Sequence, residues 1–246
     1  TGFALLPGMT GYAPAARRPI ADAFRTTAHA AVRFCVRNEI HADTVSYLSI
    51  VFAAAAAVCL WQAGQQPWLL LAAPLLCLAR LWCNMLDGMV ALAAGEASRR
   101  GEIVNELPDR ISDILIFVGV AHSGLCDPAS GYVAAILAVL TAYVGVLGHA
   151  VAGRREYGGV MTKPWRMVVL GLGAWITFAL RTNGLDPALG KGWTVLDATC
   201  LLIALGCVQT VVVRLRHTLS LVEVNHDVPR PGTRAPDQRN ARSIAA

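Results

Sequence analysis

The stretch NMLDGMVALAAGEASRRGEIVNELPDRISD, residues 84–113, decides the fold because it lies between two segments that are apolar enough to enter a membrane. It nevertheless carries Asp87, Asp109 and Asp113 around a turn rich in glycine and alanine. Each unpaired acid near the middle of a bilayer costs about 2.5 to 3.5 kcal/mol on insertion scales. We therefore expect these carboxylates to share a polar partner.

The composition indicates an integral membrane protein. Of the 246 residues, 55% are hydrophobic and 15% are charged, with a mean hydropathy of +0.51, whereas about a quarter of the residues in a soluble domain are charged. The first forty residues are mixed and basic, so we expect no removable signal peptide. The net charge of +5 comes without an aromatic-basic motif, and we expect no nucleic-acid partner.

The seven cysteines form no CxxC pair and mostly lie in apolar runs, which predicts small buried side chains rather than disulfides.

Six segments are long and apolar enough to cross the hydrocarbon, which takes about 20 residues per helix. They are residues 44–61, 68–92, 107–124, 130–152, 165–181 and 193–213. Residues 19–40 place apolar side chains at helical spacing opposite arginines, a pattern typical of a helix that lies in the interface. The predicted fold is all-α and polytopic, with six transmembrane helices preceded by an amphipathic interfacial helix.

The distribution of basic residues predicts the topology. Most of the 21 lysines and arginines lie in the amino-terminal segment, the loops after the second and fourth spans, and the carboxyl-terminal tail. By the positive-inside rule, both termini are cytoplasmic and the protein lies in the inner membrane. We expect three parts: a cytoplasmic segment with the interfacial helix (1–43), a six-helix membrane domain (44–215) and a disordered cytoplasmic tail (216–246).

Oxygen-bearing side chains share one face of the second span and one face of the third. Carboxylates and amide carbonyls are the ligands that hard divalent cations prefer. Small residues beside them leave a strip where a nucleotide or pyrophosphate approaches the backbone. The second span carries Asn84, Asp87, Gly88 and Ala91, and the third carries Asn105, Asp109 and Asp113.

This stretch resembles the signature of the CDP-alcohol phosphotransferases, integral membrane enzymes of phospholipid synthesis, written D-x2-D-G-x2-A-R-x8-G-x3-D-x3-D. The spacing holds throughout, and five of the eight fixed positions match. The segment IHADTVSYLSI at the first span also looks like the family's usual sequence there, and the resemblance covers roughly residues 18–215. The fixed positions fall on Asn84, Asp87, Gly88, Ala91, Leu92, Gly101, Asn105 and Asp109, of which Asn84, Leu92 and Asn105 depart from the pattern.

The resemblance implies a transferase that moves a substituted phosphate from a CDP-alcohol, in particular CDP-diacylglycerol, to a small polar alcohol and releases CMP. It implies a Mg²⁺ or Mn²⁺ cofactor and a homodimer. Asp109 takes the place of the general base. The implied metal ligands are Asn84, Asp87, Asn105 and Asp109, with Asp113 recruited because two aspartates are replaced, and the implied nucleotide contacts are Gly88, Ala91 and Gly101.

The basic loop after the fourth span, GRREYGGVMTKPWRM, is a candidate site for an acceptor phosphate. Its predicted phosphate-binding residues are Arg154, Lys163 and Arg166. A basic cytoplasmic loop is also what the topology alone requires, so the two interpretations stay open.

Two local alternatives concern the third span. Asn105 either caps this helix, with Pro108 in its first turn, or the helix begins near Gly101 and Pro108 removes an internal hydrogen bond. We also expect Arg80 and Asp113 to form an ion pair at the floor of the site.

Two rival functions remain. One is a catalytically degenerate relative that binds a nucleotide-lipid or scaffolds partners without turnover. The other is a small transporter or channel, which predicts polar stripes through to the far leaflet, whereas spans one, four and five are nearly free of charge.

Overall fold

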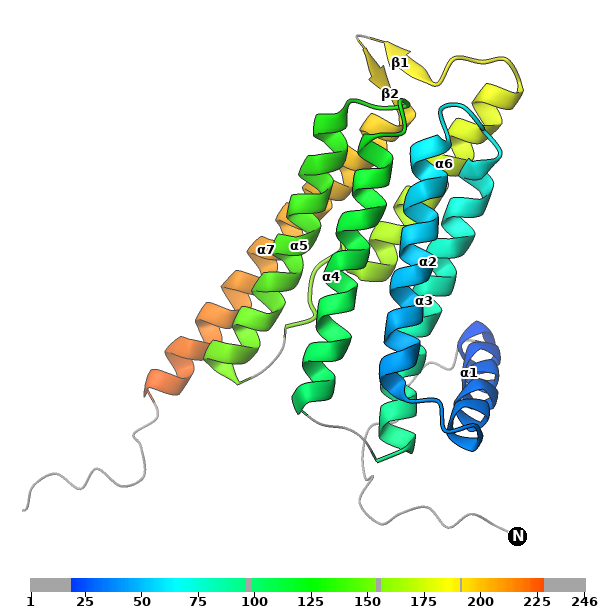
Figure 1. Ribbon diagram of the computed structural model, residues 1–246. Helices are drawn as coiled ribbons and strands as arrows, with labels where there is room; N and C mark the ends of the chain where they lie inside the picture. The colour runs from blue at the N-terminus through cyan, green and yellow to red at the C-terminus, as the bar shows by residue number, and fades with distance from the viewer. Residues whose placement is uncertain (1–18, 96–98, 154–155, 191, 228–246) are drawn as a thin grey trace, which may run out of the picture.

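The computed structural model describes residues 19–95, 99–153, 156–190 and 192–227, with side chains for 28–95, 106–153, 156–190 and 192–223. It is built from long helices, as the sequence predicts (Figure 1). The helices are α1 (Pro19–Arg37), α2 (Ala42–Gln62), α3 (Leu69–Ala93), α4 (Arg99–Ala121), α5 (Pro128–Ala152), α6 (Lys163–Thr182) and α7 (Val195–Asp227).

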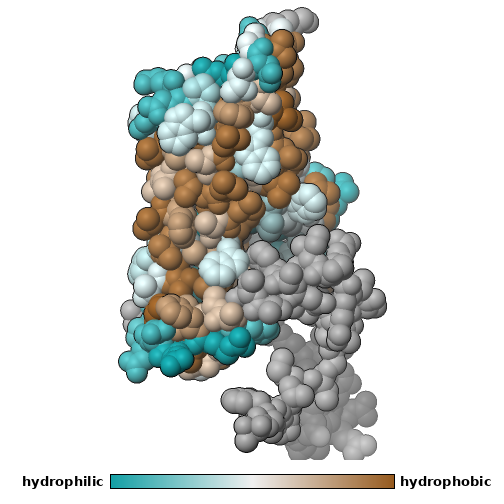
Figure 2. All heavy atoms as spheres, turned by 90° about the vertical axis from the view of Figure 1, so that its right-hand side faces the viewer, coloured by the Kyte–Doolittle hydropathy of each residue, from teal (hydrophilic) through white to brown (hydrophobic). Residues whose placement is uncertain are grey.

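The surface of the bundle is that of a membrane protein. Figure 2 shows hydrophobic side chains over the middle of one face and hydrophilic ones at its upper and lower ends. Four helices, α2, α3, α5 and the part of α7 before Glu223, are long and apolar enough to cross a membrane. The predicted all-α, multi-pass architecture is confirmed.

The predicted number of six spans is not confirmed by that criterion. Helices α4 and α6 run within the same bundle (Figure 1), but they carry more polar side chains than the other four. In α4 these are the acids and arginines of the stretch quoted above, and α6 begins with Lys163 and Arg166. A buried polar stripe lowers mean hydropathy without making a helix unfit for a membrane interior, because its charges are paired inside the protein.

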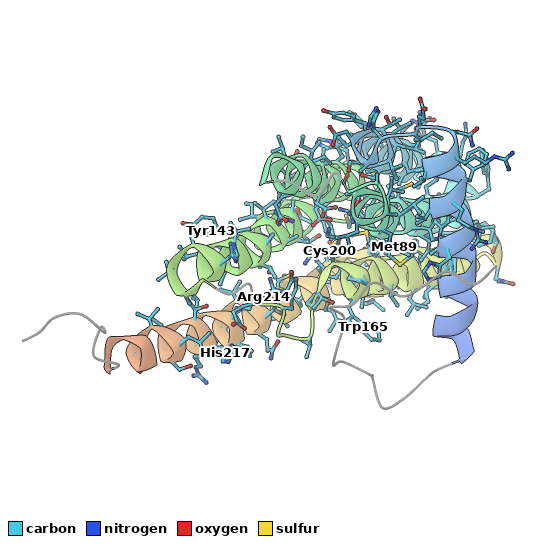
Figure 3. All side chains as sticks on the ribbon, turned by 90° about the horizontal axis from the view of Figure 1, so that it is seen from below. Met89, Tyr143, Trp165, Cys200, Arg214 and His217 are labelled. Atoms are coloured by element: carbon cyan, nitrogen blue, oxygen red, sulfur yellow. The ribbon has the colours of Figure 1, made fainter. Side chains whose placement is uncertain are left out.

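Helix α1 is the predicted amphipathic helix. Figure 3, viewed from below, shows α1 along its length while α2, α3 and α4 are seen nearly end-on. Its packing face contains Val32 and Cys35, which cluster with Val45 of α2 and Leu86 of α3. Phe34, on the expected apolar stripe, is instead 62% exposed. A helix that lies across the bundle end in this way suits the interface.

The connections differ from the prediction at two places. The segment between α6 and α7 contains a small antiparallel ribbon, β1 (Ala188–Gly190) with β2 (Trp193–Thr194), which the sequence did not predict. Helix α7 continues to Asp227, so residues 216–227 are helical and the boundary expected at 215 is wrong. Residues 228–246 of the expected tail lie outside the described residues.

The core is made of small and aliphatic side chains that let helices approach closely. At Gly119 of α4, an added Cβ would lie 2.4 Å from the carbonyl oxygen of Ala57 in α2, so only glycine fits this crossing. All seven cysteines are free and buried or half-buried, which confirms the prediction that they are not disulfides.

Two features of the packing open the region around residues 84–113. Helix α2 packs along both α3 and α4, whereas α3 and α4 contact each other over only a short stretch. Figure 1 also shows that α6 begins part-way up the bundle, above the lower ends of α5 and α7. The first turn of α6 is therefore brought level with the polar faces of α3 and α4.

Candidate functional site

The polar faces of α3 and α4 meet at Asp109, which is 4% exposed. Asn84 of α3 donates its amide N–H to Oδ1 of Asp109. Lys163, the first residue of α6, donates to Oδ2 of the same carboxylate. The predicted convergence of the second and third helices is confirmed, and α6 completes the site on a third side.

A second layer of charges lies one turn deeper. The Nη2 atom of Arg80 is 3.1 Å from Oδ1 of Asp113 and 3.1 Å from the carbonyl oxygen of Asp109. Arg166 donates to the other oxygen of Asp113 at 2.6 Å. The side chains of Arg80 and Asp113 are fully buried. The expected ion pair between Arg80 and Asp113 is thus confirmed.

Asp87 is held by hydrogen bonds from α2 and from its own helix. Its Oδ2 accepts a hydrogen bond from Ser46 of α2 at 2.7 Å, and its Oδ1 accepts from the backbone N–H of Gly88 at 2.6 Å. Lys163, which contacts Asp109, also interacts electrostatically with Asp87. No described atom lies within 4 Å of where a Cβ on Gly88 would stand, which leaves the predicted open strip beside Asp87.

The start of α4 resolves one alternative. The helix begins at Arg99, with Pro108 inside it, so the interpretation of Asn105 as an N-cap is wrong. Pro108 has no N–H, and it leaves one carbonyl of the preceding turn without its helical donor. Gly101 and Asn105 lie in α4, but their side-chain positions are outside the described residues, as is all of Arg154.

The contacts of Asp113 do not fit its predicted role as a metal ligand. Both of its oxygens accept hydrogen bonds from guanidinium groups, those of Arg80 and Arg166. These two buried positive charges would repel a metal cation. Within the described residues there is no group of three or more His, Cys, Asp or Glu side chains placed to hold a metal ion. The other predicted ligands whose side chains are described are two carboxylates, Asp87 and Asp109, and the amide of Asn84, and each of them already takes part in a hydrogen bond.

A cavity of about 260 Å³ adjoins Lys163. It lies among α4, α5, α6, α7 and the connection between α5 and α6, and most of its charged side chains are basic. The lining residues that bear charge are Arg110, Glu156, Lys163, Arg166 and Arg214. Because Lys163 both lines this cavity and contacts Asp109, it connects the cavity to that carboxylate. Lys163 and Arg166, two of the residues predicted to bind a phosphate, both line this cavity.

Three side chains at the candidate site were missed by the sequence analysis. Ser46 holds Asp87, and Glu156 and Arg214 line the cavity. Arg214 is 8% exposed and donates to the carbonyl oxygens of Thr141 and Gly158. A buried arginine at the end of an apolar helix is itself a signal of function, and this signal was available in the sequence. Figure 3 shows Arg214 and His217 on α7, beside the connection between α5 and α6.

This connection is fixed to α7. The N–H of Met161 donates to Thr210 at 2.9 Å, and Arg214 donates to Gly158 at 2.9 Å. Gly159 has φ +103° and lies against Thr210, where an added Cβ would be 2.3 Å from a side-chain carbon. Only glycine combines this backbone conformation with this close approach. The placement of Lys163 therefore depends on Gly159.

Replacing Gly159 with alanine is expected to lower the free energy of unfolding by about 2 kcal/mol, because it adds backbone strain and a steric clash. Gly158→Ala is the matched control, since its Cβ would make an ordinary contact at 3.6 Å with Val213. Thermal unfolding of both variants in detergent micelles measures the difference. Equal stability of the two variants would contradict this account of the connection.

The chain has relatives among curated proteins. It is 32% identical over 107 residues to an inner membrane protein, YnbA, of Escherichia coli, covering 44% of this chain and 53% of that protein. It is 30% identical over 146 residues to the phosphatidylinositol phosphate synthase of Mycolicibacterium smegmatis, covering 56% of this chain and 63% of the synthase. The alignments thus span between about half and two thirds of these relatives. No family model matches.

Solved structures show the same fold. The phosphatidylinositol phosphate synthase of Mycobacterium tuberculosis with CDP-DAG bound superimposes with a TM-score of 0.63 at 22% identity, over 78% of this chain and 94% of that one. The same synthase in complex with manganese and citrate also gives a TM-score of 0.63. The predicted resemblance is therefore confirmed: this chain is similar in sequence to phosphatidylinositol phosphate synthases and shares the fold of one of them.

Proposed function

We propose that this protein transfers a substituted phosphate from a CDP-linked lipid such as CDP-diacylglycerol to the hydroxyl group of a small polar alcohol, and releases CMP. The observation that carries this proposal is the position of Asp109. Its carboxylate contacts Asn84, which lies one helical turn from Gly88 on α3, and Lys163, which lines the basic cavity. A group between two substrate spaces is placed to move a proton from one substrate during the reaction.

The reaction follows from this placement. The acceptor oxygen forms a bond to the β-phosphorus, and the bond from that phosphorus to the oxygen it shares with the α-phosphate breaks. CMP carries away the electrons of the broken bond. Asp109 accepts the proton of the acceptor hydroxyl. In phosphoryl transfer most of the catalysis comes from positioning the substrates and from stabilising the charge that develops. Lys163 is near enough to stabilise this charge once the acceptor hydroxyl has replaced Lys163 as the partner of Asp109.

The donor set fits one divalent cation rather than two. Mg²⁺ in proteins is usually bound by one or two carboxylates together with substrate phosphates, and Asp87, Asp109 and the Asn84 carbonyl supply such a set. We propose that these three hold Mg²⁺ or Mn²⁺, with Asn105 as a further candidate. When bound, the ion would neutralise charge on the pyrophosphate. The crystal structure of the Mycobacterium tuberculosis homologue in complex with manganese supports this assignment.

Restoring the missing carboxylate is expected to strengthen metal binding. Asn84→Asp should tighten Mn²⁺ binding about tenfold, because the affinity of oxygen sites rises with the number of charged ligands. Electron paramagnetic resonance of free Mn²⁺, titrated into purified protein, measures affinity and stoichiometry without turnover. Asn38→Asp, at an exposed position after α1, adds the same charge away from the site. If Asn84→Asp binds no more tightly than the Asn38 variant, the assignment is wrong.

We propose that the acceptor binds in the cavity of Arg110, Lys163, Arg166 and Arg214. Several guanidinium and ammonium groups in one small buried space favour an anionic ligand such as a phosphate. The names of the homologues, phosphatidylinositol phosphate synthases, support a phosphorylated alcohol. Arg154 remains a candidate for the same role.

The test is CMP release by the purified protein in mixed micelles of CDP-diacylglycerol with Mg²⁺ or Mn²⁺. Inositol phosphate, glycerol phosphate, inositol and serine are supplied one at a time. CMP that appears only with an acceptor supports the proposal, and phosphorylated acceptors are expected to give the highest rates. Failure of every acceptor to release CMP overturns it.

A second candidate function has its own support. Asn84 and Asn105 replace two carboxylates, and Lys163 contacts the oxygen of Asp109 that would take the proton. These features fit a relative that binds a nucleotide-lipid without turning it over. Tight binding of CDP-diacylglycerol without CMP release, with any acceptor, would favour this alternative.

We further propose an inner-membrane location with both termini cytoplasmic, a homodimer, and a membrane domain that begins at residue 44. The location is supported by the name of the Escherichia coli relative and by the basic residues of the loops. Reporter fusions after residue 246 and within the α4–α5 connection test the orientation, since they should report opposite sides.

A further inference from the structure

Glu156 lines the basic cavity with an oxygen that has no partner. It is 7% exposed, and its Oε1 atom is buried without a hydrogen bond to any described residue. Buried polar atoms are nearly always paired, and leaving a charged one unpaired costs free energy. An unpaired carboxylate oxygen in the wall of a binding cavity therefore indicates that a ligand supplies the missing donor.

The other oxygen of Glu156 is already used. Its Oε2 atom lies 2.6 Å from Nδ1 of His217 on α7. The attachment of the α5–α6 connection to Thr210 and Arg214 holds this part of the chain in place. Glu156 is therefore positioned before a ligand arrives, which reduces the entropic cost of recognition.

The charges around the cavity limit what the donor can be. Lys163, Arg166 and Arg214 line the same space, and they favour an anionic group on the ligand. An anion cannot itself pair with the Glu156 carboxylate, because both would be acceptors with like charge. The ligand must therefore carry an anionic group and, away from it, a hydrogen-bond donor.

We propose that Glu156 selects the acceptor by accepting a hydrogen bond from a hydroxyl group other than the one that reacts. The acceptor class is then a phosphorylated polyol rather than a phosphate with a single hydroxyl. This inference rests on the proposed function, because it assigns the cavity to the acceptor. Glu156 acts on specificity, whereas the proton transfer stays with Asp109.

The experiment compares KM for two acceptors, inositol phosphate and 2-hydroxyethyl phosphate, whose only hydroxyl is the reacting one. Glu156→Leu removes both carboxylate oxygens, and the leucine side chain is similar in size to that of glutamate. It is expected to raise the ratio of the KM for inositol phosphate to that for hydroxyethyl phosphate about tenfold, the usual effect of one hydrogen bond to a charged group. Glu156→Gln keeps one neutral oxygen and should raise the ratio less. If Glu156→Leu does not fold, Glu156→Gln alone carries the comparison.

His217→Gln is the matched control. It removes the partner of Oε2 and leaves Oε1 unchanged, so the KM ratio should stay within twofold of the original protein. A KM ratio unaffected by Glu156→Leu overturns the proposal, as does a His217→Gln variant that reproduces the same change. Either result would make Glu156 a structural partner of α7.

Calorimetric binding of the two phosphates, without CDP-lipid, separates this inference from the proposed function. If the protein releases no CMP, tighter binding of inositol phosphate than of hydroxyethyl phosphate, lost in the Glu156 variants, still supports the role of Glu156. If CMP is released but the two phosphates bind equally well before and after the substitution, the function stands and the role of Glu156 fails.

Discussion

Asp109→Asn is expected to reduce the rate of CMP release by about 10² to 10⁴-fold, the range over which a positioned general base contributes. The asparagine amide has almost the same shape as the carboxylate, so the contacts with α3 and α6 change little in geometry. It has no basic oxygen that can hold the acceptor's proton. The loss should therefore appear in kcat, with a much smaller change in the KM for CDP-diacylglycerol.

The measurement is steady-state CMP release at saturating acceptor. Asp186→Asn makes the same chemical change at an exposed position at the far end of the bundle and should keep the original rate. An Asp109→Asn protein within tenfold of the original rate would show that another group takes the proton. The cavity leading to Asp109 would then need a different interpretation.

Arg80→Met is expected to destabilise the protein by about 3 to 5 kcal/mol, the cost of removing one partner from a buried ion pair. Arg80 is the only described side chain that joins Asp109 to Asp113 directly, and its own side chain is fully buried. Methionine has a side chain of similar length but no charge. Among the described residues, Arg166 would then be the only cation paired with Asp113. Thermal or denaturant unfolding in micelles measures the loss.

Two further variants test the cause of that loss. Arg37→Met removes an arginine from an exposed position on α1 and should cost less than about 1 kcal/mol. The double variant Arg80→Met with Asp113→Asn removes the excess negative charge that Arg80→Met leaves in the cluster and should recover part of the stability. If the double variant is no more stable than Arg80→Met, the loss comes from packing and not from the carboxylate.

Helical periodicity was enough to predict the elements that carry the site. Asn84, Asp87, Asp109 and Asp113 fall at spacings of three or four residues, so each set had to share one face of a helix. The cost of charge in a membrane then required the two faces to meet. The same reasoning predicted the pair of Arg80 with Asp113, because both lie deeper than the rest on neighbouring helices.

The remaining part of the site depends on the path of the chain between helices. Lys163 reaches Asp109 only because the α5–α6 connection brings α6 to the middle of the bundle. No local pattern encodes that path. The role expected for Asp113 failed for the same reason, since Arg166 approaches it from a helix 53 residues away in sequence. Local signals also left open whether Asn105 caps α4, and the helix instead begins at Arg99.

The balance of charge at the site has a consequence for how the protein is made. Among the described residues, the acids Asp87, Asp109 and Asp113 stand with Arg80, Lys163 and Arg166, so the cluster carries no net charge of its own. Newly synthesised chains can therefore close the bundle in the bilayer before any divalent ion is captured. Biogenesis should be insensitive to magnesium or manganese starvation, and a chelator should stop turnover without releasing unfolded protein.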